Sequence, residues 1–117
     1  MRVARAARLG RSKFCGDGLP DDDRAGLAQR DKARALYAVL AAECDACVSL
    51  SAPAAAPLGL ESTGDPSCTA QVSLLGIPAV SLPVLQDDGL PLGLQVTGYI
   101  NGDAQAIAVA AAIKALF

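Results

Sequence analysis

The sequence predicts an α/β chain in which a β-hairpin is flanked by helices. The hairpin carries most weight, because two apolar runs of strand length, residues 74–83 and 89–98, are joined by a polar turn that ends in Asp88-Gly89. The second observation is the helical spacing of apolar residues over 24–44, and the third is an almost wholly apolar helical segment over 104–116.

The composition sets the scale of this fold. At 117 residues the chain is at most one domain. Hydrophobic residues make up 52% and aromatic residues 3%, with no Trp, so the core has to be built from Ala, Leu, Val and Ile, and each alanine buries little surface. A chain this apolar, with few charges after Asp45, suggests elements that are buried on both faces inside something larger.

Residues 1–20 form a basic arm, which we separate from the remainder of the chain at 21–117. The arm could bind nucleic acid, act as an organelle transit peptide, or be a solvated and poorly ordered terminus. We favour the last reading, since only Phe14 is available for stacking on bases. No apolar segment of a secretory signal follows the charges, and no run of about 18 apolar residues occurs. We therefore expect a cytoplasmic protein with neither nucleic acid nor a membrane as partner. The first 16 residues contain no acidic residue and carry the cations Arg2, Arg5, Arg8, Arg11 and Lys13.

A helix is predicted over residues 24–44, with the acidic residues 21–23 at its positive end. A short buried strand over 45–50 follows, then an extended Pro/Ala connector over 51–57. Residues 58–68 are expected to form a loop because they contain glycine and proline. The expected apolar side of the helix comprises Leu27, Ala28, Asp31, Ala35, Leu36, Val39 and Leu40. The cations expected to reach solvent are Arg24, Arg30, Lys32 and Arg34, and a weak Asp31–Arg34 pair is possible.

The predicted hairpin runs from about residue 72 to residue 96. Pro83 and Pro91 lack backbone donors, so they should lie at strand ends or bulges. Asp103 is expected to cap the last helix, over about 104–116. That helix is apolar nearly all round, and such a helix is normally buried on most sides.

Several kinds of chemistry are excluded or disfavoured. The chain has no His, which removes Ser-His-Asp, Cys-His and histidine-based metal sites. Cys44 and Cys47 form a Cys-x-x-Cys pair at the end of a predicted helix, where the dipole does not stabilise a thiolate. With Cys15 and Cys68 they are expected to be reduced structural thiols, and we expect no metal and no cofactor. The acidic groups at Asp17 with 21–23, and at 87–88, lack the spacing of a calcium loop.

One pattern is more specific. Residues 61–66 (Glu-Ser-Thr-Gly-Asp-Pro), the run 74–83, residues 89–96 (Gly-Leu-Pro-Leu-Gly-Leu-Gln-Val) and the helix after Asp103 follow one another in this order. Together they resemble the C-terminal part of the amidase signature family, well over 45–117 and loosely over 19–43. The resemblance implies a C-terminal fragment of the amidase-signature fold, whose hairpin belongs to a central mixed sheet.

Enzymes of this family hydrolyse carboxamide C–N bonds with a Ser–(cis-Ser)–Lys triad and a Gly/Ser-rich oxyanion loop. The resemblance places those parts upstream of this segment. No Gly-Ser-Ser word occurs, and Lys13, Lys32 and Lys114 are not at motif positions. No catalytic residue is therefore carried over, and the chain alone is expected to be inactive.

The resemblance also implies a substrate wall over residues 67–73. Its substrate-binding candidates are Ser67, Thr69 and Ser73, which would contact a small amide in a complete amidase domain. The alternative hypothesis is a non-catalytic partner that completes a separately encoded N-terminal half. A homo-oligomer is a further possible assembly.

Overall fold

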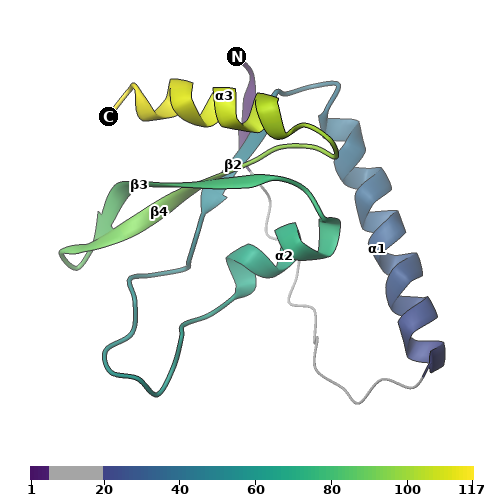
Figure 1. The fold of residues 1–117 in the computed structure, drawn as a ribbon, viewed down its shortest axis with the longest axis horizontal. Coiled ribbons are helices and arrows are strands. Elements are labelled where there is room, and N and C mark those ends of the chain that lie inside the picture. The colour runs from purple at the N-terminus through teal and green to yellow at the C-terminus, as the bar shows by residue number, and fades with distance from the viewer. Residues whose placement is uncertain (6–19) are drawn as a thin grey trace.

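The computed structural model describes residues 1–5 and 20–117, which form a four-stranded sheet and three helices (Figure 1). The α/β class is confirmed. In chain order the elements are β1 (Val3–Arg5), α1 (Pro20–Leu40), β2 (Ala46–Leu50), α2 (Ser67–Leu75), β3 (Ala79–Asp87), β4 (Leu90–Thr97) and α3 (Asp103–Lys114).

The sheet is mixed, with the strand order β1-β2-β4-β3. β1 runs parallel to β2, and β4 is antiparallel to both β2 and β3. The predicted turn closes the β3–β4 hairpin: Asp88 and Gly89 have φ values of 50° and 75°, the two left-handed positions that a tight hairpin turn requires. Pro83 lies where the register shifts between Leu82 and Leu85, so the predicted bulge is confirmed.

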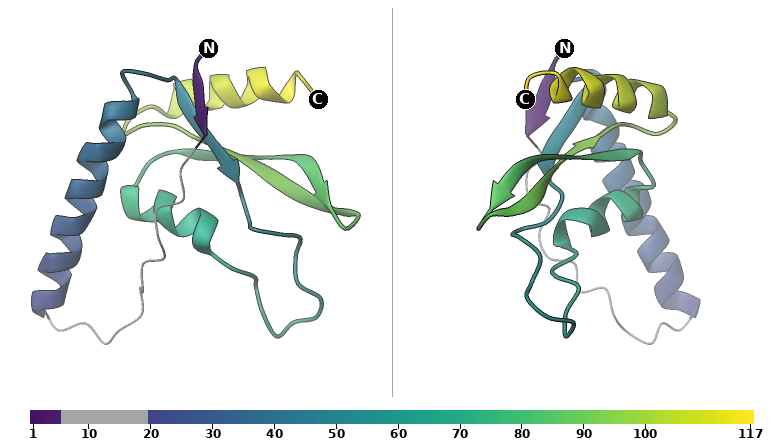
Figure 2. Two further views of the ribbon diagram at one scale, coloured as in Figure 1. Left: turned by 180° about the vertical axis from the view of Figure 1, so that it is seen from behind. Right: turned by 60° about the vertical axis from the view of Figure 1, so that its left-hand side comes forward.

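The two faces of the sheet differ in polarity. α3 covers one face, and α2 lies on the opposite side (Figure 2). Since side chains alternate along a strand, the face under α3 is apolar and the other face carries the polar residues Ser49, Ser81, Gln95 and Thr97. The core under α3 consists of Ala46, Leu82, Val96, Val109, Ala110 and Ile113, with Val48, Val80, Val84 and Leu94 packed against it.

Helix α2 corrects the expectation of a loop and an early hairpin strand over residues 67–75. The Asp65 carboxylate accepts a hydrogen bond from the Ser67 backbone at 2.9 Å, which turns the chain into the helix. Gly76 ends the helix in the left-handed conformation, with φ 62°, and its N–H donates to Val72 O. The hairpin therefore begins at Ala79 and ends at Thr97, later than predicted.

Helix α1 also differs from expectation, because it spans Pro20–Leu40 and ends four residues earlier than predicted. Arg34 does not extend into solvent: its Nε donates to Leu75 O at 2.8 Å. Asp31 pairs with Arg30, at 3.0 Å, and not with Arg34. Leu36 and Val39, predicted to be buried, are 73% and 60% exposed.

Both ends of the chain depart from the predictions. Residues 6–19 of the predicted basic arm, Cys15 included, lie outside the described residues. Val3–Arg5, near the start of that arm, forms β1, a strand that was not predicted. At the other end Gly102, not Asp103, precedes α3, and Asp103 is the first helical residue. Its charge still lies in the first turn, where the helix dipole favours it. Ile107 on the outer side of α3 is 60% exposed, so the described part of the chain covers one side of this apolar helix and leaves the other exposed.

Candidate functional site

The predicted substrate wall lies on α2, which is attached to the rest of the chain along one side. Gln95 Nε2 donates to Cys68 O at 3.3 Å, and the Arg34 guanidinium holds Leu75 O at the other end of the helix. Leu75 and Ile77 are buried beneath it. One long side of α2 is therefore fixed against the polar face of the sheet and against α1, and the opposite side is open.

Thr69 and Ser73 are both exposed and are four residues apart, so they share the open side of α2. The Thr69 hydroxyl donates to Pro66 O at 3.2 Å. Ser67 is exposed as well, but it belongs to the first turn and points to a different side of the helix. The structure thus brings together two of the three predicted site residues.

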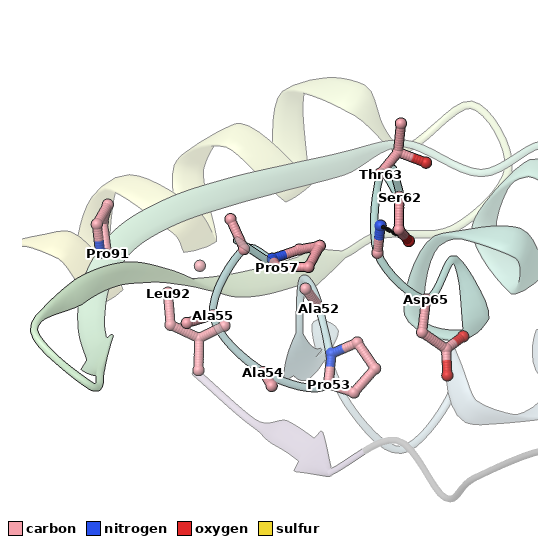
Figure 3. Close-up of a pocket in the computed structure, with 13 residues that line it drawn as sticks. Ala52, Pro53, Ala54, Ala55, Pro57, Ser62, Thr63, Asp65, Pro91 and Leu92 are labelled. Atoms are coloured by element: carbon pink, nitrogen blue, oxygen red, sulfur yellow. Dashed lines mark hydrogen bonds between the residues drawn. The ribbon is translucent and has the colours of Figure 1, made fainter. Parts of the chain in front are cut away.

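A hollow of about 700 Å³ that the sequence analysis did not anticipate lies next to the start of β4 (Figure 3). It is lined by residues 52–57, 62–65 and 91–93, and none of the three predicted site residues borders it. Two hydrogen bonds fix its connector: Ser51 N donates to Gly93 O at 2.8 Å, and Ala55 N donates to Asp87 Oδ2 at 2.8 Å. In the sequence, the sign of this hollow was that the Pro/Ala connector, residues 51–57, lies shortly before the amidase-like segment 61–66.

The lining of this hollow suits binding better than catalysis. Its polar side chains are Ser62, Thr63 and Asp65, and no lysine is among the lining residues. Ser62 Oγ accepts the Gly64 N–H at 3.1 Å, and the Asp65 carboxylate accepts the Ser67 N–H. A nucleophile needs an adjacent base to become reactive, and these residues contain no such pair.

A cluster of two half-buried tyrosines and two buried thiols lies at the other end of the sheet. The Tyr37 and Tyr99 rings pack with centroids 5.4 Å apart. Tyr37 OH lies 2.9 Å from Thr97 Oγ1, and Thr97 donates in turn to Cys47 O. Tyr99 OH lies 2.9 Å from Cys44 Sγ. The Cys-x-x-Cys pair is thus built into the join between α1, β2 and β4.

The surroundings of Cys47 and the two tyrosines keep these three groups neutral. Burial raises the pKa of the Cys47 thiol, and the hydrogen bonds from Tyr37 and Tyr99 offset this only in part. Burial also raises the pKa of both tyrosines above the ordinary value. A thiol that stays protonated at neutral pH is a poor nucleophile and a poor metal ligand. In residues 1–5 and 20–117, no three His, Cys, Asp or Glu side chains come together as a metal site, and no helix there is long and apolar enough to cross a membrane.

Comparisons with known proteins add a family to this geometry. No family model matches the chain. Over 96 residues it is 38% identical to a glutamyl-tRNA(Gln) amidotransferase subunit of Granulibacter bethesdensis, and the match covers 75% of this chain and 18% of the relative. The same subunit from Natranaerobius thermophilus is 35% identical over 79 residues, 62% of this chain and 16% of the relative.

A shorter stretch matches a second kind of protein. The fatty acid amide hydrolase of Medicago truncatula is 51% identical over 45 residues, which cover 38% of this chain and 7% of that protein. The chain therefore spans less than a fifth of these relatives. Among solved structures, a crystal structure of an amidase superposes with a TM-score of 0.73 at 29% identity, over 85% of this chain and 26% of the other.

Proposed function

Because the chain belongs to the amidase signature family, we propose that it forms the C-terminal part of a hydrolase that cleaves carboxamide C–N bonds. The observation that carries this proposal is the superposition on an amidase over 85% of the chain, at 29% identity. The superposition extends over most of the chain, and not over one motif alone.

In this proposal the chain supplies a scaffold and part of the substrate site. The open side of α2 would present the Thr69 and Ser73 hydroxyls to a bound amide, and Ser67 would contribute from the first turn. Hydroxyl groups can donate to the amide oxygen and accept from its N–H, so they orient an amide without taking part in bond cleavage. The hollow beside the connector would receive apolar parts of the substrate, because alanine and proline dominate its lining.

The nucleophile, base and oxyanion donors would come from another segment. The buried Cys47 is held neutral, and the hollow contains no lysine. A site without an activated nucleophile does not add to an amide carbonyl at a useful rate. We therefore propose that the 117-residue chain alone does not hydrolyse amides, and that hydrolysis of an amide to a carboxylic acid and an amine needs the rest of an amidase domain.

A chimera tests this function. The chain would replace the matching segment of the amidase of known structure, and hydrolysis of simple carboxamides would be followed by release of the amine. We expect a folded, active chimera and no activity from the chain alone. A chimera that folds but leaves amides intact would contradict the proposal, as would amide hydrolysis by the isolated chain. In an active chimera, replacing Thr69 and Ser73 together by alanine should raise KM, and Gln29→Ala on α1 is the matched exposed control.

The second candidate function is that of a non-catalytic partner chain that completes a separately encoded amidase half in the cytoplasm. The observation that favours it is the exposure of large apolar side chains on α1 and α3, among them Leu36 and Ile107. Co-expression with the N-terminal part of an amidase should give a stable heterodimer. A chain that stays monomeric and folds cooperatively beside that partner would speak against this role.

A further inference from the structure

The outward side of α1 carries an apolar surface that the described part of the chain does not use. Ala28, Ala35, Leu36 and Val39 fall within one side of the helix, and all four are exposed. We call these four residues the α1 stripe. Leu36 and Val39 are 73% and 60% exposed.

The side of α1 that packs is a different one. Arg34 donates to Leu75 O, and Tyr37 bonds to Thr97 and stacks on Tyr99. These contacts face α2 and the sheet, and in Figures 1 and 2 the rest of α1 runs away from the body of the chain. The helix is therefore attached through its more polar side, whereas its apolar side faces outward. In a complete globular fold, an amphipathic helix normally packs its apolar side against the core and exposes its polar side to solvent.

The charges around the α1 stripe indicate which side chains a covering segment would need. Lys32 lies within the stripe and is exposed, and Asp31 on the flank of the stripe is exposed as well. The Asp31 carboxylate is paired with Arg30, whereas Lys32 forms no ion pair among residues 24–117. A segment that covers the stripe should thus be apolar and carry an acidic residue that reaches Lys32.

We propose that the α1 stripe is the docking surface for an apolar segment of the amidase domain that lies outside this chain, with an acidic residue opposite Lys32. This inference rests on the proposed function. Most of the amidase fold that the chain matches lies outside the matched part, so a large body of fold is available to cover the stripe. The contact makes α1 a two-sided helix, bound to its own chain by Arg34 and Tyr37 and to the remaining domain by Leu36 and Val39.

Thiol labelling tests the docking apart from the activity. Val39→Cys places a reporter in the α1 stripe, and Leu90→Cys places a matched reporter at the hairpin turn, where Leu90 is 44% exposed. Both are made in the full chain with Cys15 and Cys68 replaced by serine, since Cys44 and Cys47 are buried. Alkylation rates are compared between the free chain and the chimera with the amidase. We expect labelling at position 39 to slow by about tenfold or more in the chimera, and labelling at position 90 to change far less.

Each result of the labelling experiment either supports or overturns the docking proposal. Equal labelling of position 39 in the free chain and the chimera would overturn the docking, whether or not the chimera hydrolyses amides. Protection of position 39 in an inactive chimera would support the docking and count against the proposed function. Protection that develops in the free chain as its concentration rises would show that a second copy covers the stripe, which would overturn the occupant proposed here. Charge is tested in the chimera by Lys32→Glu, which should speed labelling at position 39 several-fold if an acidic residue faces Lys32. An unchanged or slower rate would refute the acidic partner of Lys32.

Discussion

Replacing Gly93 with alanine tests how the candidate hollow is attached to the sheet. The Ser51 and Ser81 hydroxyls lie 2.6 Å apart in a hydrogen bond that passes over Gly93. A Cβ added to Gly93 would run into both hydroxyl oxygens and would lie 2.8 Å from Ser51 Cβ. The hydroxyls can rotate away, but a carbon–carbon approach of 2.8 Å forces the connector backbone itself to move.

The expected cost follows from three terms. The lost Ser51–Ser81 hydrogen bond removes about 1 kcal/mol from the free energy of unfolding. Forcing an extra methyl group into a filled site costs about 1–3 kcal/mol. Alanine returns about 0.4–1 kcal/mol by restricting the unfolded chain. We expect Gly93→Ala to lower the free energy of unfolding by about 1–3.5 kcal/mol, which is the balance of these terms.

Urea unfolding followed by far-ultraviolet circular dichroism measures this change, since the chain has no Trp. Gly26→Ala is the matched control, because a Cβ there meets nothing within 4 Å, and it should stabilise α1 by about 0.5–1 kcal/mol. Ser51→Gly removes the close carbon and one oxygen, so Gly93→Ala should cost less in that background. The reasoning is refuted if Gly93→Ala unfolds within about 0.5 kcal/mol of wild type, or if Ser51→Gly leaves its cost unchanged.

Three further predictions concern the end of α2, the Tyr37–Thr97 hydrogen bond and the Cys47 thiol. Gly76→Ala should cost about 1–2 kcal/mol in urea unfolding, because the residue has φ 62° and a Cβ would lie 2.7 Å from Arg34 Nη2; a neutral result would contradict the left-handed end of α2. Tyr37→Phe should cost about 0.5–1.5 kcal/mol by losing its bond to Thr97, and an unchanged midpoint would show that this bond is not formed in solution. Because burial raises the pKa of Cys47, its folded form holds the proton above pH about 8.5, where the unfolded chain releases it. Stability should be level below that pH and fall above it, and Cys47→Ala should flatten this fall; an equal slope in both proteins would refute the assignment.

The hairpin was predictable because its determinants are local. Asp88-Gly89 supplies the two left-handed residues of the turn, and the apolar runs on either side supply the strands. Pro83 marked the bulge for the same reason, since a residue without an N–H cannot continue a regular ladder. Each of these features depends on residues that are neighbours in sequence.

Helix α2 was missed because the predicted loop extended through Gly64 and Pro66 to residue 68, and the predicted hairpin began at about residue 72. In the structure Asp65 turns the chain into the helix and Gly76 caps its end. Nine residues without glycine or proline lie between Pro66 and Gly76, and that length is enough for two turns. The nine-residue spacing between these two turn residues, and not either residue alone, predicts the helix.

The buried side of α1 and the hollow could not be found from sequence periodicity. The apolar spacing marks Val39 as buried, whereas the chain half-buries Tyr37 and Arg34 through partners 41 to 60 residues away. The hollow likewise forms where the connector meets β4. Such contacts depend on the register of strands far apart in sequence, which no local pattern specifies. Two of the three candidate site residues, Thr69 and Ser73, do share a side, because the helix that was missed places them four residues apart.

The distribution of exposed apolar side chains bears on what surrounds this chain. Large apolar residues are exposed on α1, on the outer side of α3 and in the loop below the sheet, where Leu58 and Leu60 are fully exposed. In Figures 1 and 2 these three places lie on different sides of the molecule. A two-fold dimer buries one self-complementary patch on each protomer, so it would cover one of these places and leave the other two in water. A fold that wraps around the chain covers all three at once, which is why the remainder of an amidase domain accounts for this surface better than a second copy does.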